Sequence, residues 1–248
     1  NKPVAEDLKI SCNGTFGKLG SKWSALYSPD LMVQVTVTGQ LALLMLIEAL
    51  DDILGVEVIS ANTDGVTIRC RRDTEQEACD AVKAWEGITG FETERADYSG
   101  LYSRDVNSYI AVKTNGEIKT KGAYGSGLPL HKNIYAPICS KAVIDYVSLD
   151  ASIAGTIAAC QDIRQFICMR SVKGGAIWRG QDVGKVVRWY FSTEVDEAIL
   201  YKVNNHLVPE TFKARPCIML PADIPFDLDR AWYVKEAYSL CTDLGVGV

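Results

Sequence analysis

The chain has few of the residues that build metal centres or disulfide frameworks. Its 248 residues include two histidines, and its eight cysteines form no C-x-x-C pair. A zinc site built on His and Cys is therefore not expected, and the scattered cysteines, mostly among apolar neighbours, indicate reduced core residues of an intracellular protein. Long apolar runs are also missing. The longest, Leu41 to Ile47, is far shorter than the roughly 20 residues that cross a bilayer.

What is present is typical of a globular protein. Hydrophobic residues make up 48% and charged residues 23%, enough apolar material for one large domain or two of ordinary size. The net charge of −5 argues against a simple nucleic-acid-coating protein but allows a basic groove on an acidic body. The sequence begins at Asn1 rather than Met, so we expect a fragment, a processed product or a trimmed chain. We expect a cytoplasmic location and no membrane partner.

One stretch, Val56 to Ile68, organises the rest of the sequence. Two runs rich in β-branched residues flank the polar turn Asn62-Thr63-Asp64-Gly65. This pattern predicts a β-hairpin that presents Asp64 at its tip. A carboxylate held on a packed hairpin can bind a hard cation such as Mg²⁺, which prefers oxygen ligands. Taken alone, the same residues are more often an ordinary solvated turn.

A second motif lies upstream, in a helix expected from about Val4 to Leu19. Lys9, Asn13 and Phe16 are spaced so that they share one helix face, and the glycines at 14 and 17 bare the backbone beside it. Such a face could hold a phosphate, a hydrogen-bonding group and a flat ring. The plainer interpretation of this stretch alone is a helix that ends at a glycine.

Together the two motifs resemble signatures of family B DNA polymerases. Lys9-x-x-x-Asn13-Gly14-x-Phe16-Gly17 resembles the fingers signature K-x-x-x-N-S-x-Y-G, with Gly for Ser and Phe for Tyr. The stretch from Ser60 to Gly65 resembles the palm signature Y-x-D-T-D-S, with Asn62 in place of the first Asp. The whole chain resembles the C-terminal part of phage-type members, which implies a phage or prophage origin.

The resemblance implies a role for each matching residue. Asp64 would be the metal-bridging carboxylate and Asn62 a weaker oxygen ligand, with Mg²⁺ or Mn²⁺ as the ion. Lys9 would act on the triphosphate as a catalytic cation, and Phe16 would pack against the nascent base pair. The implied nucleotide-binding residues are Lys9, Asn13, Phe16 and Thr63. Tyr109 would steady the primer end, although the Lys that precedes this Tyr in the family is replaced here.

The pattern between residues 21 and 125 predicts an α+β palm: an antiparallel sheet with helices on one face. A helix from Met32 to Asp52 carries an apolar face that we expect to be core and to cover the sheet bearing Asp64. A second helix opens near Asp73, with Thr74 and Glu77 as a capping box. A second hairpin follows from Ser108 to Gly122, turning at Asn115-Gly116.

A glycine-rich boundary lies near residues 125–129. The resemblance identifies the region after it, residues 126–248, as a mixed α/β thumb. It also identifies residues 1–20 as the end of the fingers. Helices are predicted over Pro137–Leu149, Ile153–Met169 and Asp227–Leu244, with a β-rich stretch over 173–191. Cations alternate there with aromatic residues and could grip a nucleic-acid backbone; snorkelling cations on a buried aromatic strand are the alternative. The predicted DNA-binding residues are Tyr109, Lys119, Lys121, Lys173, Arg179, Lys185 and Arg188.

One part of the polymerase signature is missing. Nothing matches the D-x-x-S-L-Y-P-S motif, which carries the family's other metal-binding Asp, and the 3′–5′ exonuclease signatures are also absent. We therefore expect a DNA-directed DNA polymerase that acts on a primer-template and dNTPs but is inactive without an upstream segment as partner. Two alternatives remain: a degenerate polymerase-like module that only binds DNA or a replisome, and a different palm enzyme such as a nucleotidyl cyclase or reverse transcriptase.

Overall fold

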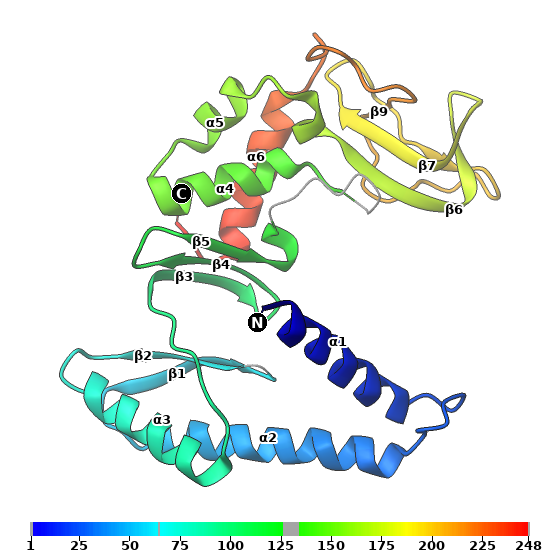
Figure 1. Ribbon diagram of the computed structural model, residues 1–248. Helices are drawn as coiled ribbons and strands as arrows, with labels where there is room; N and C mark the ends of the chain where they lie inside the picture. Colours follow the sequence, from blue (N-terminus) through cyan, green and yellow to red (C-terminus); the bar gives the residue numbers. More distant parts are fainter. Residues whose placement is uncertain (1, 64, 126–133, 248) are drawn as a thin grey trace. The chain divides into compact units, whose positions relative to one another are not determined.

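A computed structural model describes residues 2–63, 65–125 and 134–247, with the side chains of the described residues from position 4 onward. The chain divides into two compact units, residues 1–95 and 96–248, and each is described by itself. Both combine helices with antiparallel strands (Figure 1), which confirms the α+β class. The predicted boundaries of fingers, palm and thumb are functional divisions and stay predictions.

The first unit consists of three helices and one hairpin. In chain order these are α1 (Lys2–Leu19), α2 (Pro29–Asp51), β1 (Val56–Asn62), β2 (Gly65–Cys70) and α3 (Glu75–Thr89). The hairpin and the two upstream helices are thus confirmed. Helices α1 and α2 diverge from a short connection (Figure 1), where the amide of Ser28 donates to the carbonyl of Leu19.

The core of the first unit is small and lies between the C-terminal half of α2, the hairpin and α3. Its buried residues are Leu46, Leu50, Ile53, Val56, Ala78 and Trp85. The indole Nε1 of Trp85 donates to the carbonyl of Ala42 at 2.7 Å, which locks α3 onto α2. The predicted covering of the hairpin by α2 is therefore confirmed for this half of the helix.

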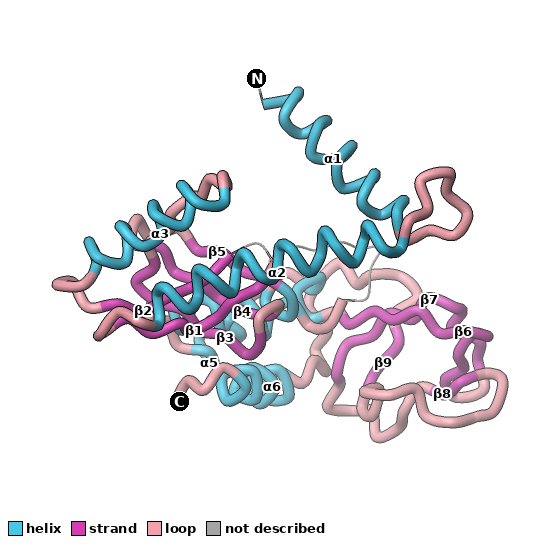
Figure 2. The backbone as a smooth tube through the Cα atoms, turned by 90° about the horizontal axis from the view of Figure 1, so that it is seen from below, coloured by secondary structure: helices cyan, strands magenta, loops and turns pink. Residues whose placement is uncertain are grey.

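The prediction that the whole apolar face of α2 is core is wrong. Leu41, Leu44 and Leu54 are 56%, 46% and 89% exposed. The reason is geometric, because α2 runs on past the ends of the hairpin strands (Figure 2), and no described residue of its own unit covers that N-terminal half as a core. Among the described residues, α2 is the one helix long and apolar enough to cross a membrane, by length and composition alone, and 6% of its apolar window is buried. A single helix of this kind is weak evidence for a membrane span, because core helices of soluble proteins and signal sequences pass the same test.

The predicted capping box of α3 is also wrong. Thr74 occupies the N-cap position, but its side chain makes no cap hydrogen bond. Its hydroxyl instead donates to the carbonyl of Arg71 at 3.2 Å, which tightens the turn that leaves β2. Helix α3 ends at Gly90, whose φ of 71° is accessible to glycine without strain.

The second unit holds two antiparallel sheets and three α-helices within its described residues. The strands are β3 (Tyr98–Asp105), β4 (Ser108–Lys113), β5 (Ile118–Lys121), β6 (Cys168–Trp178), β7 (Gln181–Phe191), β8 (Leu200–Tyr201) and β9 (Ala214–Pro216). The helices are α4 (Pro137–Leu149), α5 (Ile153–Ala159) and α6 (Arg230–Asp243), with 3₁₀ turns η1 (Gly122–Tyr124) and η2 (Ile163–Phe166). The sheet orders are β3-β4-β5 and β8-β6-β7-β9.

The two predicted hairpins do not share one sheet. The described strands β1 and β2 pair only with each other, while β4 and β5 join β3, a strand that the sequence did not reveal. The segment between α3 and β3, residues 90–97, has no regular structure. An antiparallel architecture is therefore confirmed, and a single palm sheet is not.

The sequence prediction of one helix from Ile153 to Met169 is wrong. Helix α5 stops at Ala159, and the side chain of Asp162 then accepts from the amide of Arg164 to begin η2. Cys168 already pairs with Trp189 in the second sheet. The apolar positions on which the helix was predicted, Ile163 and Ile167 among them, are buried in the core even so.

One continuous core fills the second unit, between α4, α6 and the two sheets. Its largest fully buried side chains include Trp189, Tyr124, Tyr233, Phe166 and Phe191. The ring of Tyr233 packs edge-on against Phe166 at 5.1 Å, and its hydroxyl donates to the carbonyl of Phe166 at 2.8 Å. This core is far larger than that of the first unit, so it supports the surfaces on both sheets.

The cysteines in the described residues form no disulfide. Four of them, Cys139, Cys168, Cys217 and Cys241, are buried, and burial raises the pKa of each thiol, to about 11 for Cys217. A thiol with a raised pKa is a poor nucleophile, which fits the prediction of core residues. Cys70, Cys79 and Cys160 are half-buried, and Cys12 on α1 is exposed, so the prediction of core residues is confirmed for four of the eight cysteines.

Candidate nucleotide and nucleic-acid site

Helix α1 presents the fingers-like motif on an open surface. Lys9 and Asn13 are exposed, and the ring of Phe16 is 41% exposed. A Cβ added at Gly14 or Gly17 would meet no atom within 4 Å. The three side chains therefore share a helix face with free space beside it, as predicted, and a flat ligand could approach the backbone there.

The β1–β2 hairpin closes on the palm-like motif. Asn62 at the end of β1 pairs with Gly65 at the start of β2, and the register shifts by one residue between Val58 and Ser60. Such a bulge re-aims the side chains beyond it, so Ser60, Thr63 and Asn62 do not continue the simple alternation of the strand. Asp64, the predicted metal ligand, lies outside the described residues.

The described residues do not by themselves form a two-metal centre. Within residues 2–63, 65–125 and 134–247, no three His, Cys, Asp or Glu side chains gather where they could hold a metal ion. Asn62 offers one amide oxygen, whereas Mg²⁺ sites are usually built on carboxylates. A metal site that includes Asn62 would therefore need further oxygen ligands, and the expectation that an upstream segment supplies them stays a prediction.

Three of the predicted DNA-binding residues lie on one face of the β3-β4-β5 sheet. Tyr109 on β4 pairs with Lys121 on β5, and Ala111 pairs with Lys119, so these side chains point the same way. The other face carries Ile110 and Ile118, which pack into the core. On the first face Lys119 and Lys121 are exposed and Tyr109 is half-buried, while Ala111 beside Lys119 is 1% exposed, so this face is open at the two lysines and covered at Ala111.

The other predicted cations lie on the long β6–β7 hairpin. Lys173, Lys185 and Arg188 are exposed, and Lys173 sits in a bulge where Gly174 and Gly175 adopt φ values of 85° and 86°. Together with Lys119 and Lys121, these residues form what we term the cation set. In the described part of the chain no acidic side chain forms an ion pair with any of them.

Arg179 at the tip of this hairpin differs from the cation set. Its Nε lies 3.1 Å from Glu197 Oε1, and its guanidinium lies 4.5 Å from the ring centroid of Trp178. Both contacts satisfy the cation within the protein. The prediction that Arg179 binds DNA is therefore less well supported than the same prediction for Arg188.

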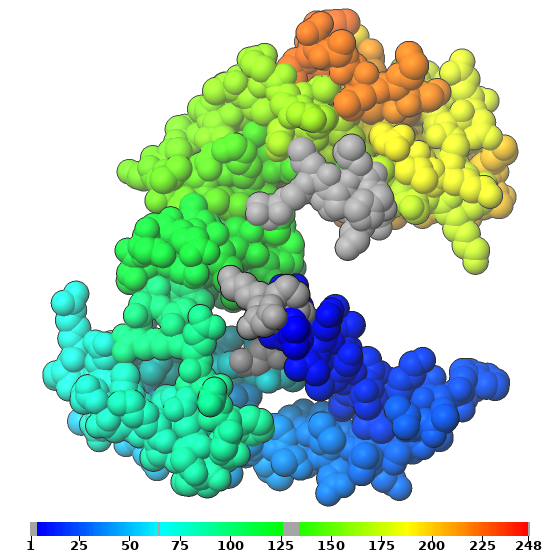
Figure 3. All heavy atoms as spheres, viewed as in Figure 1, coloured from blue at the N-terminus to red at the C-terminus, as the bar shows by residue number. Residues whose placement is uncertain are grey.

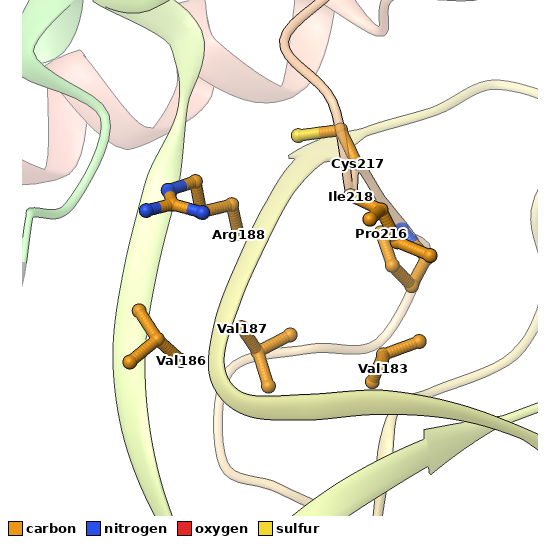
Figure 4. Close-up of a pocket in the computed structure, with 7 residues that line it drawn as sticks. All are labelled: Val183, Val186, Val187, Arg188, Pro216, Cys217 and Ile218. Carbon is orange, nitrogen blue, oxygen red and sulfur yellow. The ribbon is translucent and has the colours of Figure 1, made fainter.

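A small hollow lies beside Arg188 (Figure 4). Its volume is about 80 Å³, and its walls are Val183, Val186, Val187, Arg188, Pro216, Cys217 and Ile218. Small-molecule sites typically occupy about 300–1,000 Å³. The hollow is therefore too small for a nucleotide.

A buried polar cluster supports this hairpin, and no sequence pattern predicted it. Asp227, which is 2% exposed, accepts hydrogen bonds from the hydroxyls of Tyr190 (3.1 Å) and Ser192, and its Oδ2 lies 3.1 Å from Nε of Arg215. Burial, and then the charge of Asp227, raises the pKa of Tyr190 to about 12. Because Asp227 comes from the segment before α6 and Tyr190 from β7, no local spacing could have revealed the cluster.

No protein-family model matches the chain, and no curated protein matches it significantly.

Proposed function

We propose that the chain is the C-terminal portion of a template-directed DNA polymerase of family B, comprising the end of the fingers, the palm and the thumb. The main support is that two motifs belong to one compact unit. The helix α1 carries Lys9, Asn13 and Phe16 on an open face, and the β1–β2 hairpin turns at the palm-like motif. Helix α2 joins them, in the order that the resemblance implies.

The reaction would be nucleotidyl transfer. The primer 3′-hydroxyl attacks the α-phosphorus of a dNTP, a new P–O bond forms, the bond to pyrophosphate breaks, and the hydroxyl proton passes to solvent water. Bound Mg²⁺, or Mn²⁺, would supply charge stabilisation at the phosphates, with Asp64 and Asn62 as ligands and an upstream polypeptide completing the set. Lys9 would offset the charge of the triphosphate, and Phe16 would pack against the nascent base pair.

The second unit would hold the primer-template. Tyr109, Lys119 and Lys121 share one outward face of the β3-β4-β5 sheet, and the remaining members of the cation set lie on the β6–β7 hairpin. Cations with no acidic partner among the described residues can neutralise phosphates without first breaking an ion pair. The three members on the β6–β7 hairpin, Lys173, Lys185 and Arg188, support the assignment of residues 126–248 as a thumb.

A degenerate module that binds DNA without extending it is the second candidate. It is favoured by Asn62 and Gly65, which stand where the family signature has Asp and Ser. The absence of an acidic cluster from the described residues is compatible with either candidate. In the polymerase candidate primer extension requires Asp64, whereas the DNA-binding module extends no primer with or without it.

The decisive experiment is primer extension by the chain combined with the polypeptide encoded immediately upstream, with Mg²⁺ and dNTPs. We expect extension with the pair, none with this chain alone, and none when Asp64→Ala replaces the wild type. Lys9→Ala should lower extension strongly, while Lys18→Ala should not. Lys18 is the matched control, because it is an exposed lysine on the opposite side of the same helix.

Each outcome separates the candidates. Extension that survives Asp64→Ala would remove Asp64 from the metal site. A folded complex that binds duplex DNA but extends no primer would contradict the polymerase proposal and support the DNA-binding module. Extension by this chain alone would contradict the expected need for an upstream partner.

A further inference from the structure

Helix α2 carries a second apolar stripe that is separate from its core-facing side. The α2 stripe consists of Val33, Val37, Leu41 and Leu44, which are 55%, 42%, 56% and 46% exposed. Their spacings of four, four and three residues align them along one side of the helix. The buried residues of α2, Leu46 and Leu50, lie on the opposite side. The space-filling view shows this part of α2 at the surface of its unit (Figure 3).

Acidic residues close both ends of the stripe on the same side of the helix. Asp30 precedes Val33 by three residues, Glu48 follows Leu44 by four, and Asp51 follows Glu48 by three. Within the described residues no Lys or Arg forms an ion pair with any of these three carboxylates. Along this side of the helix, Asp30 is followed by the four apolar residues of the stripe and then by Glu48 and Asp51. Their average spacing is typical of a helix–helix seam.

The acids at the C-terminal end are placed against the helix dipole. Helix α2 has no basic residue in its last turn, and Asp51 lies there beside the C-cap residue Asp52. Carboxylates are disfavoured at this end, where the free carbonyl groups already concentrate negative charge. A cation brought to this position by another molecule would satisfy both the side chains and the helix end.

We propose that the α2 stripe docks an amphipathic helix of a separate polypeptide that has an apolar seam and basic residues at both ends of it. An apolar helix face of this kind is a common binding mode, with anchors at three- and four-residue spacings. Charge complementarity selects the partner's chemistry. The proposal does not depend on the polymerase assignment, because it uses no residue of the candidate nucleotide site.

The same charges disfavour a second copy of this chain as the occupant. In an antiparallel pairing of two stripes, Asp30 of one copy would face Glu48 of the other. In a parallel pairing each acid would face its own counterpart. Either arrangement places like charges at both ends of the seam, which is destabilising.

The experiment uses the whole chain and two synthetic helical peptides of about 20 residues, enough to span the stripe at about 1.5 Å per residue. Both peptides carry the same leucine seam; one has Lys and the other Glu at the two seam ends. By fluorescence anisotropy we expect the Lys-ended peptide to bind about tenfold more tightly, since two charge pairs change sign. Reversing the protein with Asp30→Lys and Glu48→Lys should invert this preference.

A pair of matched double variants tests the apolar part. Val37→Thr with Leu41→Gln removes the middle of the stripe and should weaken the Lys-ended peptide about tenfold or more. Val35→Thr with Leu31→Gln makes the same chemical changes at residues that are 52% and 49% exposed but off the stripe, and should leave binding unchanged. Circular dichroism checks that both variants keep their helices.

Several results would overturn the proposal. Equal binding of the two peptides, or equal weakening by the two double variants, would show adhesion without a defined seam. No binding of either peptide would show that the α2 stripe does not dock a helix of this chemistry. A dimer in sedimentation that the Val37→Thr, Leu41→Gln variant abolishes would name a second copy as the occupant.

Discussion

The salt dependence of duplex binding by the second unit should be set by the five residues of the cation set rather than by the total number of basic residues. Each phosphate neutralised contributes about 0.9 to the slope of log affinity against log salt. If all five members of the cation set contact phosphates, the slope is about −4.5, and affinity should fall about 500-fold between 50 and 200 mM salt. Replacing Lys119 and Lys121 by Ala should reduce the slope to about −2.7 and that fall to about 40-fold.

The matched control is Arg179→Ala. Arg179 already pairs with Glu197 and packs on Trp178, so its removal releases few additional counterions and should leave the slope nearly unchanged. The assay is fluorescence anisotropy of a labelled duplex, titrated with the whole chain at four or more salt concentrations. A double variant with the wild-type slope, or an Arg179→Ala effect as large as that of either lysine, would refute the reasoning from ion pairing.

Three further predictions concern stability. Trp85→Ala should lower the unfolding free energy of the first unit, measured in urea, by about 3–5 kcal/mol, because it removes a large side chain from the small core. Ile88→Ala, at a position that is 73% exposed, should lower it little. Between about pH 10 and 12 the second unit should lose stability, since the pKa of Tyr190 is raised to about 12 when folded and returns to about 10 on unfolding; a Tyr190→Phe variant should show a shallower loss in unfolding measured against pH. Asp227→Ala should cost about 1–3 kcal/mol, because it leaves the buried hydroxyls of Tyr190 and Ser192 without their acceptor while Arg215 keeps its ion pair with Glu194, and calorimetry that finds no change would contradict this.

The sequence predicted most of the elements because their signals were local. The Asn115-Gly116 turn between alternating runs and the β-branched residues around the turn after Asn62 specify hairpins with little help from the rest of the fold. The apolar spacing of Pro137–Leu149 likewise predicted α4 to the residue.

The sequence predictions were wrong where residues distant in the sequence determine the secondary structure or the burial of a segment. Apolar spacing from Ile153 to Ile167 suits a helix, but Cys168 pairs with Trp189 in a strand, and that pairing is set 21 residues away. The leucines of α2 look like core from periodicity, yet whether a leucine is covered depends on how far the neighbouring hairpin reaches. Strand β3 was missed because its polar residues gain their structure from pairing with β4.

Part of the candidate site was open to sequence reasoning and part was not. The shared face of Lys9, Asn13 and Phe16 follows from helical spacing alone. That Lys119 and Lys121 share a face with Tyr109 required the register of β4 and β5, and that Arg179 is satisfied by Glu197 required the tertiary structure. The buried support under the β6–β7 hairpin joins Asp227 to residues more than thirty positions away.

The two separate cores give the chain two cooperative folding units of unequal strength. The first buries six residues around Leu50 and Trp85, whereas the second buries a far larger continuous set around Trp189 and Tyr233. Local opening draws on the regions with the fewest buried contacts, so on heating the β1–β2 hairpin should exchange its amide protons before β6 and β7 do. Loss of whatever activity depends on that hairpin would then precede loss of the bulk circular dichroism signal, and the temperature at which the protein stops working would lie below the temperature at which it melts.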